Sequence, residues 1–448
     1  MQFISLSFLI YFSIVLVIRI FLQRKFSEKI NTLFLLVCNY LFYCFWDYRF
    51  ALLLLILTII VFVCSKYSSN KAAYYFGILS SLCILCFFKY FNFFLSTINI
   101  DPLNIILPIG ISFYTFEAIS YLVDVKNKKI EAENNLISFA SYLSFFPNIL
   151  SGPIVRAGDL LTQIKNNKKT DFSSVEIGIQ IMAIGYFKKM VIADRIGVFV
   201  NDLYARPNAF NWWTTLFAVL SYSIQIYMDF SGYSDIAIGC AKCLGFDFKK
   251  NFDLPYYSGS FTEFWRRWHI SLSTWFKDYV YIPLGGNKKG KCRQIINILI
   301  VMSLSGLWHG ANLNYVLWGL INGIILSIEK QFKLSKKNTF SVIVTFILIS
   351  FTWVFFRAET LGDAITIFKA IFTLKDGIRQ PYLWSFVGIV TMFIVTYIVV
   401  KKEDYGYYSN YLLQDLTTVK GLTLFLVLVG LTIILAYTHS SPFVYLQF

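Results

Sequence analysis

The chain has 448 residues, of which 57% are hydrophobic and only 15% are charged. Soluble domains carry about 25% charged residues, so this composition excludes a soluble globular protein and predicts an all-α polytopic membrane protein. The net charge of +15 comes from short lysine and arginine clusters beside apolar runs, which indicates cytoplasmic loops and no nucleic-acid-binding surface. Because no hydrophilic block is long enough for a separate domain, we expect one membrane domain over residues 1–448.

Apolar runs along the chain predict about eleven or twelve membrane spans plus broken segments. The runs are centred near residues 12, 38, 57, 82, 113, 145, 185, 220, 300, 318, 348, 391 and 429. The first run, FISLSFLIYFSIVLVI, is followed by Arg19 and then by RKFSEK. No positive charge precedes the run and no small-residue cleavage site follows it, so we expect a retained first span with Met1 outside, and not a signal peptide.

Two apolar segments contain glycines and acidic residues. LPIGISFYTFEAISYLVDV (107–125) contains Glu117, and SIQIYMDFSGYSDIAIG (223–239) contains Asp229. Polar groups and glycines in apolar context predict re-entrant or broken helices that line a cavity. Buried hydrogen bonding that holds such breaks together is the competing interpretation, and it is favoured for most of these polar groups.

His269 lies in the aromatic segment FTEFWRRWHISLSTWFKDYVYIPLGG. On a continuous helix Trp265 and His269 would share one face, while Arg266 and Lys277 would lie elsewhere. So many charges in an aromatic segment predict an amphipathic helix at the membrane interface and not a full span. The aromatic stripe is explained by packing, whereas a histidine on its buried face is less usual.

His309 lies in SGLWHGANLNYVLWG, within an uncharged stretch from Gln294 to Ile328. A straight helix of that length would measure about 52 Å against a hydrocarbon core of about 30 Å, so one span cannot hold it. Gly306 and Gly310 flank the histidine, which predicts a helix break there. An ionisable group at membrane depth usually faces a cavity, although a core histidine bonded to a carbonyl is equally compatible with the sequence.

The last apolar run, residues 422–437, follows a loop that begins with Lys401 and Lys402. These lysines predict a cytoplasmic loop, so the final span carries the tail, residues 438–448, to the extracytoplasmic face. By composition alone, the aromatic residues of SPFVYLQF would anchor the tail in the membrane interface.

The sequence lacks a nucleophile elbow, a Walker A loop, a dinucleotide fingerprint and an H-E-x-x-H motif. Two C-x-x-C pairs, Cys83/Cys86 and Cys240/Cys243, have no nearby histidine, so no metal site is expected. The remaining candidate chemistry is histidine acid–base catalysis inside a membrane. The alternative from another class of protein is a transporter or channel in which His309 relays protons.

Five ordered motifs together resemble the membrane-bound O-acyltransferases, most closely the bacterial branch of alginate and peptidoglycan O-acetyltransferases. They are LPIGISFYTFEAISYLVDV, FFPNILSGPIVR, YSIQIYMDFSGYSDIAIG, FWRRWHISLSTWFKDYVYIPLGG and SGLWHGANLNYVLWG. The resemblance implies a ring of tilted helices with re-entrant segments around a central tunnel, where a cytoplasmic thioester donor meets its acceptor. It also implies that His309 is the essential histidine and His269 the second one. Tyr445 in PFVYLQF matches a C-terminal tyrosine that receives the acyl group.

Two details of this sequence bear on the resemblance to that branch. Glu117 stands where a glutamine is common in that branch, and YIPLGG (281–286) favours acetyl transfer over D-alanyl transfer to teichoic acid. Further residues are expected to line or support the tunnel. These are Trp308, Asn312, Asp229, Glu117 and Trp268.

We therefore expect a multi-pass O-acetyltransferase of a bacterial plasma membrane with both termini extracytoplasmic. His309 would be the general base, His269 a supporting acid/base or orienting group, and Tyr445 the transient acyl acceptor. Acetyl-CoA is the expected donor substrate, with no bound cofactor. An extracytoplasmic SGNH-hydrolase-like acetyltransferase is the expected partner, and the final acceptor is a cell-surface glycan such as peptidoglycan, alginate or another exopolysaccharide. D-alanyl transfer to teichoic acid remains the alternative within the class.

Overall fold

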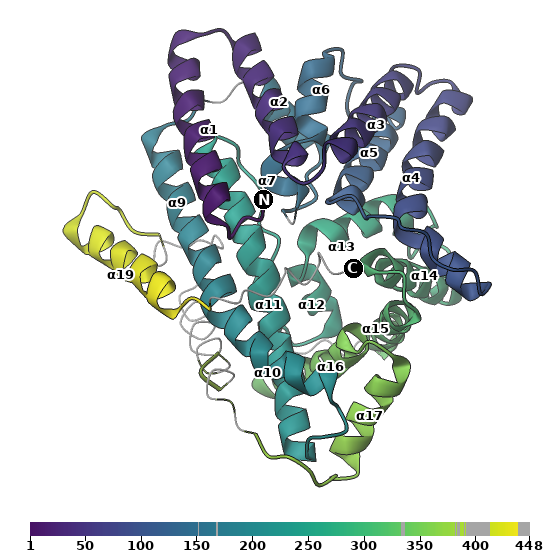
Figure 1. Ribbon diagram of the computed structural model, residues 1–448. Helices are drawn as coiled ribbons and strands as arrows, with labels where there is room; N and C mark the ends of the chain where they lie inside the picture. Colours follow the sequence, from purple (N-terminus) through teal and green to yellow (C-terminus); the bar gives the residue numbers. More distant parts are fainter. Residues whose placement is uncertain are drawn as a thin grey trace. The chain divides into compact units, whose positions relative to one another are not determined.

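The computed structural model describes residues 1–150, 152–166, 169–332, 337–380, 382, 386–388, 390 and 413–437. Within these ranges the chain is built from helices and has no β-strand (Figure 1), which confirms the predicted all-α class. The ring and the central tunnel stay predictions. The chain divides into two compact units. Unit 1 comprises Met1–Ala183 and Tyr233–Lys249, and unit 2 comprises Ile184–Gly232 and Lys250–Phe448.

Unit 1 contains the long N-terminal helices. They are α1 (Leu6–Lys25), α2 (Glu28–Cys44), α3 (Tyr48–Lys66), α4 (Lys71–Thr97), α5 (Ile111–Lys126), α6 (Leu136–Leu143), α7 (Phe146–Ile149), α8 (Ala157–Lys165) and most of α9 (Phe172–Tyr186). Side-chain caps begin three of the longest ones, since Ser5, Asp47 and Asn70 each accept a hydrogen bond from a first-turn amide.

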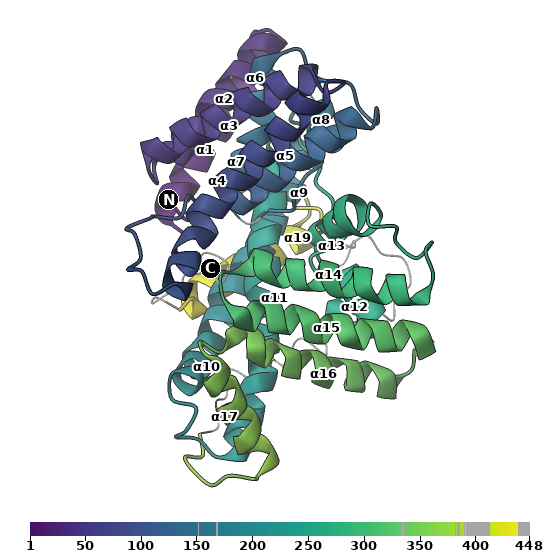
Figure 2. The same ribbon diagram turned by 90° about the vertical axis from the view of Figure 1, so that its right-hand side faces the viewer.

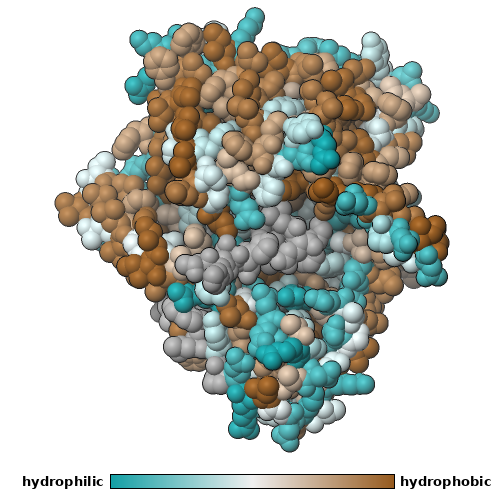
Figure 3. Space-filling view, in the orientation of Figure 1, coloured by the Kyte–Doolittle hydropathy of each residue, from teal (hydrophilic) through white to brown (hydrophobic). Residues whose placement is uncertain are grey.

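The outer surface of unit 1 is apolar. Large hydrophobic side chains of α1, α3 and α4 are exposed, and hydrophobic residues dominate the upper part of the view in Figure 3. Within the described ranges, α1, α3, α4 and α16 (Thr339–Arg357) are long and apolar enough to cross a membrane. Such faces fit a lipid environment, so this is a membrane protein, and the larger number of spans stays a prediction.

Unit 2 contains the remaining described helices. They are η1 (Phe187–Ala193), α10 (Asp194–Ala205), α11 (Trp212–Cys243, up to Gly232), η2 (Pro255–Tyr257), α12 (Phe261–Arg267), α13 (Ile270–Phe276), η3 (Lys277–Tyr281), α14 (Lys291–His309), α15 (Leu313–Phe332), α16, α17 (Leu361–Phe372) and α19 (Val419–Leu435). Figure 2 shows α14, α15 and α16 side by side. Gly306 and Gly319 lie where a Cβ would collide with the carbonyl of Tyr315 or of Met302, which is why α14 and α15 pack so closely.

Helix breaks were expected in residues 107–125 and 223–239. The structure locates the first and contradicts the second. Residues 223–239 lie inside the continuous helix α11, so the broken helix expected there is wrong. Gly232 instead permits a close helix contact. In the segment 107–125 the irregular backbone precedes α5, where Gly110 has a φ of +73° and begins the helix. The final predicted span, residues 422–437, largely coincides with α19, and the tail lies outside the described residues.

Candidate active site

His309 ends α14, and the chain turns immediately after it. Gly310 follows in an extended conformation, and the ring of Tyr315 packs where its Cβ would be. The helix restarts at Leu313, so the predicted break is confirmed. Asn312 donates a hydrogen bond to the carbonyl of Glu359 at 3.2 Å and thereby ties this turn to the chain beyond α16.

The imidazole of His309 is surrounded by aromatic rings from three directions. Its centroid lies 5.0 Å from the ring of Trp308, 5.5 Å from that of Trp318 and 5.1 Å from that of Phe356. The histidine is only 4% exposed. Bulk water is therefore largely excluded from this histidine, and electrostatic interactions at it are strengthened by the low polarity of its surroundings.

His269 lies at a break that the sequence did not reveal. The expected continuous helix is wrong, because α12 ends at Arg267 and α13 begins at Ile270. His269 between them has a φ of +42°, a left-handed conformation that a residue with a Cβ adopts only at an energetic cost. Such a conformation persists where the surroundings hold it in place.

Asn251 supplies that support. Its backbone carbonyl accepts the Ile270 amide at 2.8 Å, and its Oδ1 accepts the Ser271 amide at 3.2 Å, so one residue satisfies two first-turn amides of α13. The same Oδ1 lies 3.2 Å from Nδ1 of His269. Since an amide oxygen only accepts hydrogen bonds, Nδ1 carries the proton and Nε2 is the basic nitrogen.

The charge state of His269 follows from its burial. The side chain is 1% exposed, and burial lowers the pKa of His269 to about 3 because the charged imidazolium is poorly solvated there. Phe230 contributes to this apolar surrounding, with its ring edge-on to the imidazole at 4.7 Å. The neutral, proton-accepting form therefore predominates at physiological pH.

Trp308 contacts both histidines. Its ring centroid is 6.0 Å from that of His269 and 5.0 Å from that of His309. Trp268 precedes His269 in the chain, and both rings pack on Phe252, at 5.1 Å and 6.4 Å respectively. The structure thus brings together His309, His269, Trp308 and Trp268, four of the residues expected from the sequence.

The other expected residues have different surroundings. Asp229 pairs with Lys189 in unit 2, one residue away from Phe230. Glu117 lies in unit 1, where its Oε1 accepts hydrogen bonds from Nδ2 of Asn148 at 2.6 Å and from the Val155 amide at 3.1 Å. Glu117 thus holds α7 and the loop after it to α5 by hydrogen bonds. This is the buried hydrogen bonding that the sequence favoured for most polar groups in such segments. Tyr445 lies outside the described residues.

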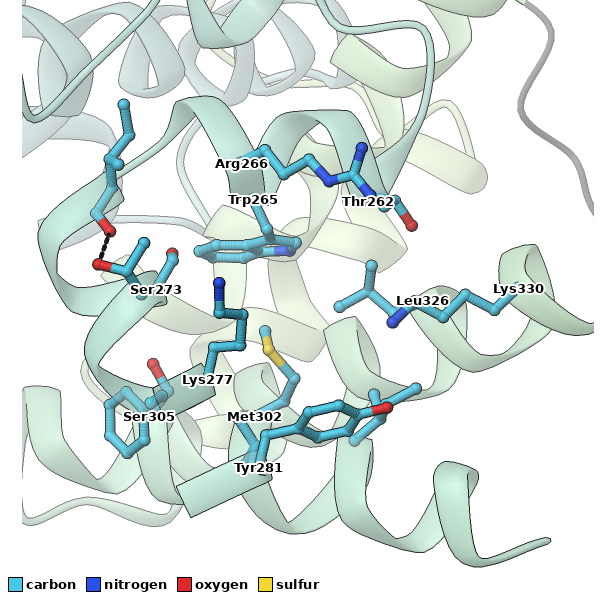
Figure 4. Close-up of a pocket in the computed structure, with 15 residues that line it drawn as sticks. Thr262, Trp265, Arg266, Ser273, Lys277, Tyr281, Met302, Ser305, Leu326 and Lys330 are labelled. Carbon is cyan, nitrogen blue, oxygen red and sulfur yellow. Dashed lines mark hydrogen bonds between the residues drawn. The ribbon is translucent and has the colours of Figure 1, made fainter. Parts of the chain in front are cut away.

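A cavity of about 540 Å³ lies in unit 2 beside the last helical turn of α14, the helix that ends at His309 (Figure 4). Its lining residues come from α12, α13, η3, α14 and α15. They are Thr262, Trp265, Arg266, Ile270, Ser273, Thr274, Phe276, Lys277, Tyr281, Ile298, Val301, Met302, Ser305, Leu326 and Lys330. Three of these are cationic and none is acidic, so the cavity suits an anionic ligand.

The cavity is connected to His309 by packed side chains. Ser305 in its wall is one helical turn before the histidine on α14. Trp265, drawn at the centre of Figure 4, contacts Trp318 edge-on at 5.6 Å, and Trp318 contacts His309 at 5.5 Å. Two packed rings, those of Trp265 and Trp318, therefore connect the cavity wall to His309.

Comparison with known proteins identifies the family. The model of the membrane-bound O-acyltransferase family matches residues 40–355, a range that includes both histidines. The chain belongs to the membrane-bound O-acyltransferase family. It is therefore an acyltransferase, and the transporter alternative is set aside.

Relatives of this O-acyltransferase are named for acyl transfer to alginate, peptidoglycan or teichoic acid. The chain is 40% identical to the probable alginate O-acetylase of Pseudomonas syringae, over 78% of this chain and 71% of that protein. It is 33% identical to the peptidoglycan O-acetyltransferase of Helicobacter pylori, over 78% of this chain and 75% of that protein. A teichoic acid D-alanyltransferase of Bacillus subtilis is more distant, 28% identical over 57% of this chain and 68% of that protein.

Sequence reasoning missed two supporting residues of the site. Asn251 lies in the polar stretch KKNFDLPYY, where nothing distinguishes it from an ordinary loop asparagine. Phe356, in the apolar run of α16, contributes to the surroundings of His309 from far along the chain. Both act through tertiary contacts, and a single sequence carries no signal for these.

Proposed function

We propose that this enzyme takes an acetyl group from acetyl-CoA on the cytoplasmic side of a bacterial plasma membrane and passes it to a carrier for a cell-surface polysaccharide. The observation that carries the proposal is the pair of buried histidines, His269 and His309, which both contact Trp308. The relatives named as alginate and peptidoglycan O-acetylases favour an acetyl group and a glycan as final acceptor.

In the proposed first step, His309 removes the proton of an acceptor hydroxyl as that oxygen attacks the thioester carbonyl. The carbon–sulfur bond of the tetrahedral intermediate then breaks, and the proton returns from the imidazolium to the leaving thiolate. The products are an oxygen ester and free CoA thiol, so no oxidant or further reactant is needed. His269, neutral and basic at Nε2, would orient the reacting groups or share the proton.

The cationic cavity is the proposed place for the phosphates of the donor. Arg266, Lys277 and Lys330 line it without an acidic residue among them, and phosphate groups pair well with such cations. A thioester extending from the cavity along Trp265 would approach His309 past Trp318.

Tyr445 is the proposed first acceptor. Its phenol, with an ordinary pKa near 10, is more acidic than a sugar hydroxyl, so its acetyl ester stays activated for a second transfer. The amide of Tyr437 donates to the carbonyl of Met190 at 3.1 Å, which fixes the start of the tail in unit 2. Tyr445 follows Tyr437 by eight positions (445 − 437), and an extended chain of that length reaches up to about 27 Å.

The remaining proposed features follow from this route. The loops rich in lysine and arginine face the cytoplasm, and both termini lie outside. A separate extracytoplasmic SGNH-hydrolase-like acetyltransferase would move the acetyl group from Tyr445 to the glycan. D-alanyl transfer to teichoic acid is the second candidate, which the more distant D-alanyltransferase relatives support. It requires a carrier-protein thioester in place of acetyl-CoA.

The test is mass spectrometry of the C-terminal peptide after the purified protein has been incubated with acetyl-CoA. We expect an acetyl group on Tyr445 in the wild type and none in Tyr445→Phe or His309→Ala. His439→Ala is the matched control, since it removes a histidine from the tail itself and leaves loading intact. Loading from a D-alanyl carrier thioester but not from acetyl-CoA would favour the second candidate. Glycan acetylation that survives in Tyr445→Phe would rule out the tyrosine relay.

A further inference from the structure

Unit 2 contains a buried cluster of three charges outside the histidine site. Nζ of Lys189 lies 2.7 Å from Oδ1 of Asp194 and 2.6 Å from Oδ1 of Asp229. The three side chains are only 1–2% exposed. One ammonium therefore faces two carboxylates in a place that water scarcely reaches.

A local change of helix type makes the first of these pairs possible. Lys189 belongs to the π-helix η1, and the amide of Asp194 donates to the carbonyl of Lys189, five residues earlier. In an α-helix two residues five apart point about 140° away from each other. The wider π-turn instead brings them onto one face. The extra residue in this turn thus serves to pair Lys189 with Asp194.

The second pair joins η1 to α11. Gly232 follows Asp229 by three residues and lies on the same face of α11. A Cβ at Gly232 would lie 2.8 Å from the carbonyl oxygen of Gly185 and 3.2 Å from the amide nitrogen of Lys189. The two backbones are therefore in close contact, and the Lys189–Asp229 ion pair fixes their register at this point.

The residue next to Asp229 contacts the site. The ring of Phe230 lies edge-on to the imidazole of His269 at 4.7 Å and also 5.0 Å from Phe252. A displacement of α11 relative to η1 would therefore move Phe230 against His269. The backbone of His269 already has a left-handed conformation, so its position depends on such neighbours.

A contribution to fold stability is a poor explanation for the presence of these three buried charges. Buried ion pairs lose much of their attraction to desolvation, and apolar residues of similar size often stabilise a fold as well or better. Buried charges in a membrane protein commonly mark function, and single π-turns are frequent at functional sites.

We propose that Lys189 is a positioning residue, whose ion pairs with Asp194 and Asp229 hold α11 in the register that places Phe230 against His269. This rests on the proposed role of His269 in acyl transfer. The cluster acts on turnover and not on donor binding, since none of its three residues lines the cationic cavity.

The decisive variant neutralises all three residues, Lys189→Met with Asp194→Asn and Asp229→Asn, so that none of these three charges is left in the interior without the others. Acetyl transfer from acetyl-CoA, KM for acetyl-CoA and thermal unfolding in detergent are measured together. We expect a folded protein whose kcat is about 10- to 100-fold lower, as for a misplaced catalytic group, with KM within about twofold of wild type. Lys188→Met is the matched control, one residue away, and keeps wild-type kcat.

Gly232→Ala tests the same register without changing a charge, and we expect it to lower kcat in the same way with KM unchanged. A folded neutral triple variant with wild-type kcat overturns the proposal. If the triple variant does not fold, Gly232→Ala decides alone, and wild-type kcat in that variant overturns the proposal. His269→Gln is measured in parallel. Full activity there contradicts the role of His269 and, with it, the positioning role built on it, whereas an inactive His269→Gln beside a folded triple variant with wild-type kcat contradicts the cluster's role alone.

Discussion

Replacing Asn251 by leucine tests how the site holds His269. The side-chain oxygen of Asn251 lies within hydrogen-bonding distance of Nδ1 of His269 at 3.2 Å, the Ser271 amide at 3.2 Å and the Ser271 hydroxyl at 2.9 Å. Leucine has a similar volume but accepts no hydrogen bond. The Asn251→Leu protein should therefore retain the packing while His269 loses the contact that fixes its tautomer and its ring orientation.

The magnitude follows from the groups left without an acceptor. A buried donor without a partner costs about 1–3 kcal/mol. The Ser271 hydroxyl can rotate to another acceptor, so two donors lose their acceptor, the His269 N–H and the Ser271 amide, and the loss is about 2–6 kcal/mol. Because a fold is stabilised by about 5–15 kcal/mol, we expect a folded protein with a lower thermal midpoint. We expect kcat for acetyl transfer to fall about 100-fold, the usual effect of a catalytic group displaced by about 1 Å.

The assay is single-turnover transfer from radiolabelled acetyl-CoA, with thermal unfolding in detergent as the measure of folding. Ser271→Ala is the control, since it removes one hydroxyl and keeps the Asn251–His269 contact, and it should change kcat less than about threefold. Asn251→Asp keeps the acceptor and adds a negative charge that raises the pKa of His269. Its activity should then be lost at acidic pH where the wild type still works. A folded Asn251→Leu protein with wild-type kcat would refute the reasoning.

Three further predictions concern the cavity, unit 1 and pH. Arg266→Ala should raise KM for acetyl-CoA about tenfold at unchanged kcat, measured by initial rates, whereas Lys291→Ala outside the cavity should leave KM unchanged. Glu117→Ala should lower stability by about 2–4 kcal/mol by depriving Asn148 of its acceptor, while Glu117→Gln keeps an acceptor oxygen and should cost less in thermal unfolding. His269 titrates near 6.5 when unfolded and near 3 when folded, so the unfolded state binds the extra proton, and stability should fall as pH is lowered from 6.5 towards 3. His269→Gln should lack that part of the pH dependence.

The sequence was sufficient for those features that depend on local chemistry. The break beside His309 could be predicted because the uncharged stretch is too long for one span and because Gly310 follows the histidine. The structure adds the reason for the glycine, which is the ring of Tyr315 packed in the place of a side chain. The exposed hydrophobic side chains of α1 and α4 likewise follow from the apolar composition of these two segments.

The predictions failed where a distant residue decides the backbone. The segment around His269 has the periodicity of one amphipathic helix, yet Asn251 caps a new helix there by accepting the amides of Ile270 and Ser271. In residues 223–239 the reverse occurred. Polar residues and Gly232 indicated a broken helix, but Lys189 satisfies Asp229 from a neighbouring helix, so α11 continues through the segment. Neither partner is close in sequence to the residue that it affects.

Trp308 contacts both histidines of the candidate site. Its ring centroid lies 6.0 Å from that of His269 and 5.0 Å from that of His309. Both imidazoles are buried, with 1% and 4% of the residue exposed. In the proposed reaction this burial is useful, because the proton removed from the acceptor is needed only when the thiolate leaves. A site from which bulk water is largely excluded keeps that proton with the reacting groups.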